Sequence, residues 1–190
     1  YLVPYLDGFV LAILPGLEDE SSEFYERSVT LLDALADAVG NDASSFCRAL
    51  WRALLLSPPM RQPAANYIRI RLVADKKLAW KKYLLEDMPL VAYAMAAALN
   101  DANSLVQRNV LDLLLRELAL HQSFFQFKSE NCRTAAVALV RGVFGALLRK
   151  DMSLTKRVHS WLLGGKENKK GLDYFDQFSR SLMIDAVDDE

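Results

Sequence analysis

Apolar residues recur three or four positions apart along most of the chain, the spacing that places them on one face of an α-helix. No segment shows the alternating pattern of a half-buried strand. Prolines, glycines and serines separate the apolar segments, as turns require. The pattern therefore predicts an all-α fold of about nine or ten helices. The predicted helices cover residues 5–14, 22–39, 42–56, 63–74, 77–85, 88–100, 104–120, 129–150, 153–163 and 172–187.

At 190 residues, the chain is long enough for one substantial core or for an array of small helical units. Short turns between the predicted helices favour antiparallel neighbours. Segment 101–115 is the best repeat-like unit, because Asp101 and Arg108 stand where HEAT repeats link adjacent units while aliphatic residues fill the core. The spacing is irregular elsewhere. We therefore expect an irregular HEAT/armadillo-like helical array, an α-solenoid with an extended core.

The chain opens with YLVPYLDGF, which lacks a starting methionine and already lies inside an apolar pattern. We therefore expect residues 1–190 to be part of a longer helical-repeat domain, truncated at its N-terminal end. An interrupted array of this kind exposes apolar end faces that neighbouring repeats would cover. Self-association of the chain is the expected consequence.

Residues 149–164, RKDMSLTKRVHSWLLG, predict a short amphipathic helix. Ser153 is expected to cap its first turn, and Gly164 to end it in a backbone conformation with positive φ. One face of the helix is then apolar and packs, while the other is polar and points away from the core. The apolar face comprises Leu154, Val158, Trp161 and Leu162, and the polar face comprises Lys156, Arg157 and Ser160.

The residues that commonly carry catalysis or bind metals are few and far apart. Cys47 and Cys132 lie in predicted helices among apolar neighbours, where buried thiols are expected. Neither cysteine has the nearby partners of a zinc site. His159 and Ser160 cannot cooperate as a dyad, because adjacent helical residues point about 100° apart. We therefore expect no enzymatic activity, no metal and no cofactor.

Charge is distributed unevenly, although the formal net charge is only −1. Residues 1–40 hold eight acidic residues against one arginine, and residues 60–82 hold seven basic residues against one acid. Residues 141–180 hold nine basic residues against four acids. A pI of about 6.2 and the lack of basic residues interleaved with aromatic ones argue against a nucleic-acid partner.

The two basic segments have two interpretations. One is a docking surface for an anionic lipid head group or an acidic partner segment. The other is a solvated helix face, whose long side chains cover apolar surface. The solvated face is the simpler interpretation for the lysines of 76–82, whereas a structural or partner contact is favoured for the basic pair 156–157. The candidate contact residues are Lys76, Lys77, Lys81, Lys82, Arg149, Lys150, Lys156 and Arg157.

Four separated blocks of sequence resemble one known family and occur in the order in which that family has them. They are GFVLAILPGLED (8–19), SEFYERSVTLLDALADAVG (22–40), SLVQRNVLDLLL (104–115) and RKDMSLTKRVHSWLLG (149–164). The family is the Dopey family, very large eukaryotic proteins of Golgi and endosomal traffic, and the blocks are similar to its N-terminal domain. Segments 69–87 and 121–133 resemble the family less, and the linker 166–171 is shorter than expected.

The resemblance implies that residues 1–190 belong to a single Dopey N-terminal helical-repeat domain, a non-catalytic scaffold in traffic between Golgi and endosomes. It implies a cytoplasmic protein held peripherally on membranes of the trans-Golgi network and endosomes. The implied partners are a large protein related to Arf exchange factors, the kinesin light chain, and phosphoinositides such as phosphatidylinositol 4-phosphate. Direct binding of anionic membranes by the basic segments, and regulation of a small GTPase, are the alternatives.

Overall fold

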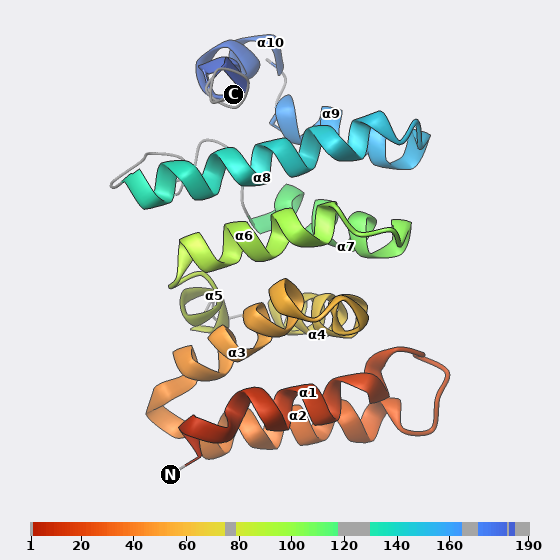
Figure 1. Ribbon diagram of the computed structural model, residues 1–190, viewed down its shortest axis with the longest axis vertical. Helices are drawn as coiled ribbons and strands as arrows, with labels where there is room; N and C mark the ends of the chain where they lie inside the picture. The colour runs from red at the N-terminus through yellow and green to blue at the C-terminus, as the bar shows by residue number, and fades with distance from the viewer. Residues whose placement is uncertain (1, 75–78, 118–129, 165–170, 182, 185–190) are drawn as a thin grey trace. The chain divides into compact units, whose positions relative to one another are not determined.

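The computed structural model of the chain describes residues 2–74, 79–117, 130–164, 171–181 and 183–184. Every regular element within these ranges is a helix, which confirms the predicted all-α fold (Figure 1). The α-helices are α1 (Leu6–Ile13), α2 (Tyr25–Val39), α3 (Ala43–Leu56), α4 (Arg61–Ala74), α5 (Ala79–Leu84), α6 (Met88–Leu99), α7 (Ser104–Glu117), α8 (Glu130–Leu148), α9 (Met152–Leu162) and α10 (Gly171–Tyr174). Short 3-10 turns are η1 (Val3–Tyr5), η2 (Leu14–Leu17), η3 (Gly40–Asp42) and η4 (Pro58–Met60), and a π-helical turn is η6 (Phe175–Ser179).

The chain divides into two compact units, residues 1–94 and residues 95–190. The division falls within α6, and each unit has its own buried residues. The expected α-solenoid with one extended core, formed by a single domain over residues 1–190, stays a prediction.

Several helix ends confirm the sequence prediction because the signals for them are local. α3 ends at Leu56, directly before the Ser57-Pro58-Pro59 segment. Asp87 caps α6, since its Oδ1 accepts a hydrogen bond from the backbone N–H of Leu90 (3.3 Å). α2 ends at Val39, and Gly40 directly after it has a φ of +62°.

α2 begins at Tyr25, later than the predicted residue 22. The Asp19 carboxylate accepts a hydrogen bond from the backbone N–H of Ser21 (2.8 Å), and the Ser22 hydroxyl accepts one from Phe24 N–H (3.3 Å). These side-chain bonds give the backbone an alternative to helical pairing. Residues 19–24 therefore form a turn ahead of the helix.

The first turn of α9 is capped by Asp151, and the prediction that Ser153 caps it is wrong. Asp151 Oδ1 accepts hydrogen bonds from the backbone N–H groups of Ser153 (2.7 Å) and Leu154 (3.2 Å). The Asp151 backbone is extended (φ −84°, ψ 116°), as an N-cap requires, whereas Ser153 already lies inside the helix. Gly164 has a φ of +80° just past the helix end, which confirms its predicted role.

The core of unit 1 forms around an apolar stripe that runs along α1 and η2. Leu6, Val10, Leu14 and Leu17 occupy the stripe at helical spacing and are fully or almost fully buried. α1 packs on α3, and η2 packs on α2 and α4. The predicted helical periodicity thus becomes a packed layer of helices within this unit.

Aromatic residues of α3 and α4 fill the centre of unit 1. Trp51 is buried and its indole N–H donates to the Leu84 carbonyl oxygen (2.8 Å), which satisfies both polar groups. Phe46 meets Tyr67 edge-to-face, with ring centroids 6.2 Å apart. These contacts join α3 to α4 and to the end of α5.

The core of unit 2 lies between α7, α8 and α9. Its residues include the predicted aliphatic positions of α7 and the predicted apolar face of α9, and all of them are buried apart from Leu162, which is half-buried. They are Val106, Val110, Leu113 and Leu114 on α7, and Leu154, Val158 and Trp161 on α9. Gln107 closes the α6–α7 turn, donating from Nε2 to the carbonyl oxygens of Leu99 (2.8 Å) and Asp101 (2.9 Å).

α8 is long and apolar enough, by length and composition, to cross a membrane. Its buried face, which includes Leu139, Val140 and Val143, packs inside unit 2 and contacts α9. Core helices pass the same length and composition test, and the buried face of α8 fits that explanation.

Candidate partner-binding surfaces

The acidic N-terminal segment is partly neutralised by arginines of the same unit. Arg52 on α3 pairs with Asp7 on α1 (2.7 Å), and Arg69 on α4 pairs with Glu20 (3.3 Å). Arg71 pairs with Asp33, the carboxylate that also accepts from the Tyr67 hydroxyl. Some acidic residues of 1–40 therefore form ion pairs with arginines of 60–82, and these pairs help to hold unit 1 together.

The basic segment 60–82 consequently presents fewer free charges than its sequence suggests. Arg61 donates to the carbonyl oxygens of Leu54 (3.2 Å) and Leu55 (3.5 Å), which lack partners within α3 because the helix ends there. Of the four candidate lysines, Lys82 is exposed. Lys76, Lys77 and the side chain of Lys81 lie outside the described residues, so a lysine contact surface at 76–82 stays a prediction.

In unit 2, Arg157 was predicted to point away from the core, but its side chain lies against α7. Its Nε donates to Asp112 Oδ1 on α7 (2.8 Å) and its Nη2 to Asp112 Oδ2 (3.3 Å). Its Nη1 donates to the Ser153 hydroxyl (2.6 Å). The sequence placed Arg157 on the polar face and favoured a structural or partner contact for the pair 156–157, but it could not reveal Asp112, which lies 45 residues away in the chain. Lys156 is exposed.

A second ion pair joins the same two helices with the opposite polarity. Arg108 on α7 contacts Asp151 at the start of α9, with Nη2 and Oδ2 2.9 Å apart. The sequence predicted that Arg108 would link adjacent helices. It does so through an ion pair with Asp151. The expected linking acid, Asp101, accepts from the backbone N–H of Asn103 (2.8 Å). Asp112 and Asp151 each hold an arginine of the other helix, and the sequence did not reveal either contact.

The turn between α8 and α9 combines apolar and basic residues at the surface, and we name it the basic tip (Leu148, Arg149, Lys150 and Met152). Leu148 is 82% exposed and Met152 70% exposed. Lys150 is exposed and has a φ of +58°, while Arg149 donates weakly to the Ala102 carbonyl oxygen (3.5 Å). Two of the predicted contact residues thus stand between two exposed apolar side chains.

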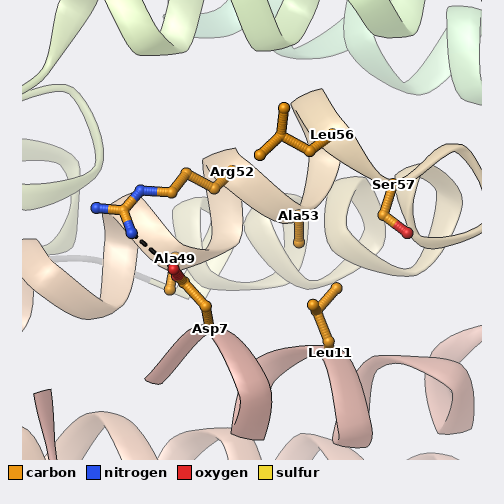
Figure 2. Close-up of a pocket in the computed structure, with 7 residues that line it drawn as sticks. All are labelled: Asp7, Leu11, Ala49, Arg52, Ala53, Leu56 and Ser57. Atoms are coloured by element: carbon orange, nitrogen blue, oxygen red, sulfur yellow. Dashed lines mark hydrogen bonds and ion pairs between the residues drawn. The ribbon is translucent and has the colours of Figure 1, made fainter. Parts of the chain in front are cut away.

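An apolar groove of about 220 Å³ lies between α1 and α3 in unit 1 (Figure 2). Leu11 (40% exposed) forms one wall and Leu56 (73% exposed) the other, above the small, buried side chains of α3. We call it the α1–α3 groove. It is lined by Asp7, Leu11, Ala49, Arg52, Ala53, Leu56 and Ser57.

The rim of the α1–α3 groove is basic on its α3 side. α3 contains Arg48 and Arg52, one turn apart and both exposed, and no acidic residue. Figure 2 shows Arg52 reaching over the groove end to Asp7, which it contacts through Nη1. Arg48 donates to the Ser45 hydroxyl (3.4 Å). The groove was missed in the sequence because its walls come from helices about 40 residues apart.

The described residues offer little for nucleophilic or metal chemistry. Burial, with a smaller effect from the charge of Glu86, raises the pKa of the Cys47 thiol to about 12, so it stays protonated at neutral pH. Within the described ranges, no three His, Cys, Asp or Glu side chains gather as metal ligands would. His159 is exposed and Ser160 is half-buried on the same short helix.

The fold and these surfaces define an all-α protein whose most distinctive features are an exposed groove and a basic tip. Residues 1–167 match the family described as Dopey, N-terminal. The chain belongs to the Dopey family. No solved structure matches the chain.

Named relatives cover nearly the whole chain but are far longer. Protein DOP1B of Xenopus laevis is 32% identical over 98% of this chain and 9% of its own length, and Protein DOP1B of Mus musculus is 33% identical over the same shares. Protein pad-1 of Caenorhabditis elegans is 37% identical over 90% of this chain and 7% of its own length. The chain therefore spans less than a tenth of these relatives.

The frog relative aligns over 211 positions, more than the 190 residues of this chain. It therefore carries additional residues within the matched region. The linker 166–171, which is expected to be short, falls outside the described residues except for Gly171.

Proposed function

We propose that the chain is a non-catalytic scaffold segment in membrane traffic between Golgi and endosomes, and that exposed helix faces bind its protein partners. Membership of the Dopey family supports the setting. The α1–α3 groove carries the proposal, because Leu11 and Leu56 remain exposed beside a floor of buried alanines. Apolar side chains that gather at such a depression mark interaction sites.

The proposed partners are a large protein related to Arf exchange factors and the kinesin light chain, as the family resemblance implies. The protonated state of Cys47 and the lack of a metal-ligand group among the described residues support a binding role over catalysis. The proposed location is the cytoplasmic face of trans-Golgi network and endosome membranes.

Co-precipitation of the two partners with full-length protein tests this proposal. Leu56→Glu places a charge on the groove wall and should reduce recovery of at least one partner. The matched control is Leu31→Glu, which changes another exposed leucine, on α2 and outside the groove lining. Both positions are largely exposed, so neither charge should unfold the chain. Undiminished recovery of both partners with Leu56→Glu would contradict the groove as their site.

A second function, direct binding of an anionic membrane, is supported by the basic tip. Arg149 and Lys150 would attract phosphoinositide head groups, while Leu148 and Met152 would enter the interfacial region. Each basic residue near an anionic surface contributes about 1 kcal/mol, so the two alone give weak binding that further lysines would strengthen. The lysines of 76–82 are the other proposed lipid contacts.

Vesicle flotation with and without phosphatidylinositol 4-phosphate separates the two functions. Arg149→Glu combined with Lys150→Glu should abolish flotation if the basic tip holds the lipid. A second variant, with Lys76, Lys77, Lys81 and Lys82 all changed to Glu, tests the other basic segment. Flotation that survives either set of changes excludes that set as the lipid contact, and flotation that is independent of the phosphoinositide contradicts head-group recognition.

A further inference from the structure

The α1–α3 groove has the size of a site for side chains and not for a small-molecule ligand. Its volume of about 220 Å³ lies below the roughly 300–1,000 Å³ of ligand pockets. Ala49 and Ala53, one turn apart on α3, are almost fully buried and form the bottom of the groove. Leu11 and Leu56 then offer apolar contacts on either side. This is the arrangement in which an amphipathic helix lays its apolar face into a groove.

The charge of the rim selects the kind of helix. Arg52 contacts Asp7 through Nη1 alone, at 2.7 Å, and both side chains are about half exposed. A guanidinium has five N–H donors, and its Nε–Nη2 edge can take a carboxylate in a two-point contact. A partner acid can therefore bind Arg52 without displacing Asp7.

Arg48 extends the basic rim by one turn but is a weaker candidate for the same contact. It also borders a second hollow that is lined by Glu86 and Asp87, whose charges oppose its own. Asp87 Oδ1 already accepts a hydrogen bond from the Leu90 N–H as the cap of α6. Arg52 is thus the residue that decides the charge preference of the groove.

We propose that the α1–α3 groove binds an amphipathic helix of a protein partner that presents apolar residues one turn apart and a carboxylate next to Arg52. The inference rests on the proposed scaffold function and specifies the chemistry of one partner. A lysine-rich helix would bring like charges to Arg52 and Arg48, and such pairs cost free energy.

Selection from a displayed library of helical peptides, with all positions randomised, tests the chemistry without a known partner. The chain is the target and its Leu56→Glu variant is used for counter-selection. We expect the recovered peptides to share apolar residues at i and i+4 and at least one Asp or Glu. Recovery of basic sequences, or of none that depend on Leu56, overturns the proposal.

Fluorescence anisotropy of one recovered peptide then tests the role of Arg52. Arg52→Glu should weaken binding by about tenfold or more, the loss expected for one charged contact. A peptide with Lys in place of its acid should bind that variant better than it binds the original chain. Leu31→Glu, outside the groove, should leave the affinity unchanged. Equal weakening by Leu31→Glu would overturn the proposed site, since the effect would not be local.

The two proposals fail in different ways. If the full-length partners still depend on Leu56 while the library yields no acidic helix, the scaffold function stands and the proposed chemistry is wrong. If acidic helices bind the groove while neither partner depends on Leu56, the groove chemistry stands and the assigned partners are wrong. Recovery of peptides that resemble a helix of this chain would overturn the proposed protein partner in favour of a second copy of the chain.

Discussion

Arg157 of α9 and Asp112 of α7 form a two-point ion pair, with Nε and Oδ1 2.8 Å apart and Nη2 and Oδ2 3.3 Å apart. Arg108 of α7 and Asp151 at the start of α9 form a second pair in the opposite sense. Each helix therefore offers the other one acid and one base. A slip of one helix along the other would break both pairs, so the two pairs fix the register of α7 against α9.

A double-mutant cycle should detect coupling between Arg157 and Asp112. We expect Arg157→Ala and Asp112→Ala to show a coupling of about 0.5–1 kcal/mol, because both side chains are about one-third exposed and solvent screens the pair. Urea unfolding of the wild type, both single variants and the double variant measures it. The coupling should fall as salt is added. Lys156→Ala changes the preceding, exposed residue and should have little effect. Additive effects of the two substitutions would contradict the coupling.

Asp151→Asn should destabilise the chain at neutral pH and matter less in acid. Asn keeps an oxygen that can cap α9 but loses the charge that faces Arg108. Hydrogen bonds from Arg108 and from the backbone N–H groups of Ser153 and Leu154 lower the pKa of Asp151. A carboxyl with a lowered folded-state pKa stabilises the fold above its unfolded pKa, near 3.9, and that stabilisation is lost as the pH falls through the folded pKa.

Melting temperatures by circular dichroism, measured from neutral pH to about pH 3, test this expectation. The wild type should melt above Asp151→Asn at neutral pH, and the gap should narrow below about pH 4. Lys156→Ala is the control, because Lys156 is exposed on α9 and takes no part in the cap. A gap that stays constant across this range would show that the Asp151 charge does not contribute.

The helices could be predicted from the sequence because their signals are local. Apolar spacing placed α3 and α6 within one residue or so at most ends, and Gly40 and Gly164 marked two helix stops. The cap of α9 could not be chosen in the same way. Asp151 and Ser153 are both good caps, and the backbone of the preceding turn, where Lys150 has a positive φ, decides between them.

The candidate surfaces were less predictable because they depend on which helices pack together. The residues around Arg157 in the chain do not indicate that it contacts Asp112. Those around Leu56 do not indicate that it forms a groove with Leu11. Charge counts along the sequence indicated basic ridges. In the folded chain, several of those arginines form ion pairs or bind carbonyl oxygens at a helix end, whereas Lys82, Lys150 and Lys156 are exposed.

Two glycines of α8 should respond in opposite ways to alanine. A Cβ at Gly142 would lie 3.2 Å from Ala96 Cα and 3.3 Å from its carbonyl oxygen, and backbone cannot move aside cheaply. At Gly145, the near atom is Asn100 Oδ1 at 3.2 Å, the end of a side chain that can rotate. Both changes gain about 1 kcal/mol of helix propensity.

We therefore expect Gly145→Ala to stabilise the chain by about 0.5–1 kcal/mol and Gly142→Ala to destabilise it by about 1–2 kcal/mol. Urea unfolding with a common slope measures both. Since each variant is the control for the other, helix propensity cancels in the comparison. Equal stabilisation by the two alanines would show that α6 and α8 are less closely packed at Gly142 than the structure has them.

α1 should also drive self-association at high protein concentration. Its buried stripe faces the core of unit 1, yet Phe9 of α1 (45% exposed) and Tyr5 at the end of η1 (66% exposed) form a second apolar face around Gly8 and Ala12. A helix that is apolar on both sides is usually covered on both sides. Sedimentation velocity over a concentration series should show a species larger than the monomer, and Tyr5→Ser combined with Phe9→Ser should shift it to the monomer. Leu31→Ser, on α2, is the matched control and should leave association unchanged. A wild-type chain that stays monomeric at the highest concentration would contradict the prediction, because the exposed apolar face would then not drive association.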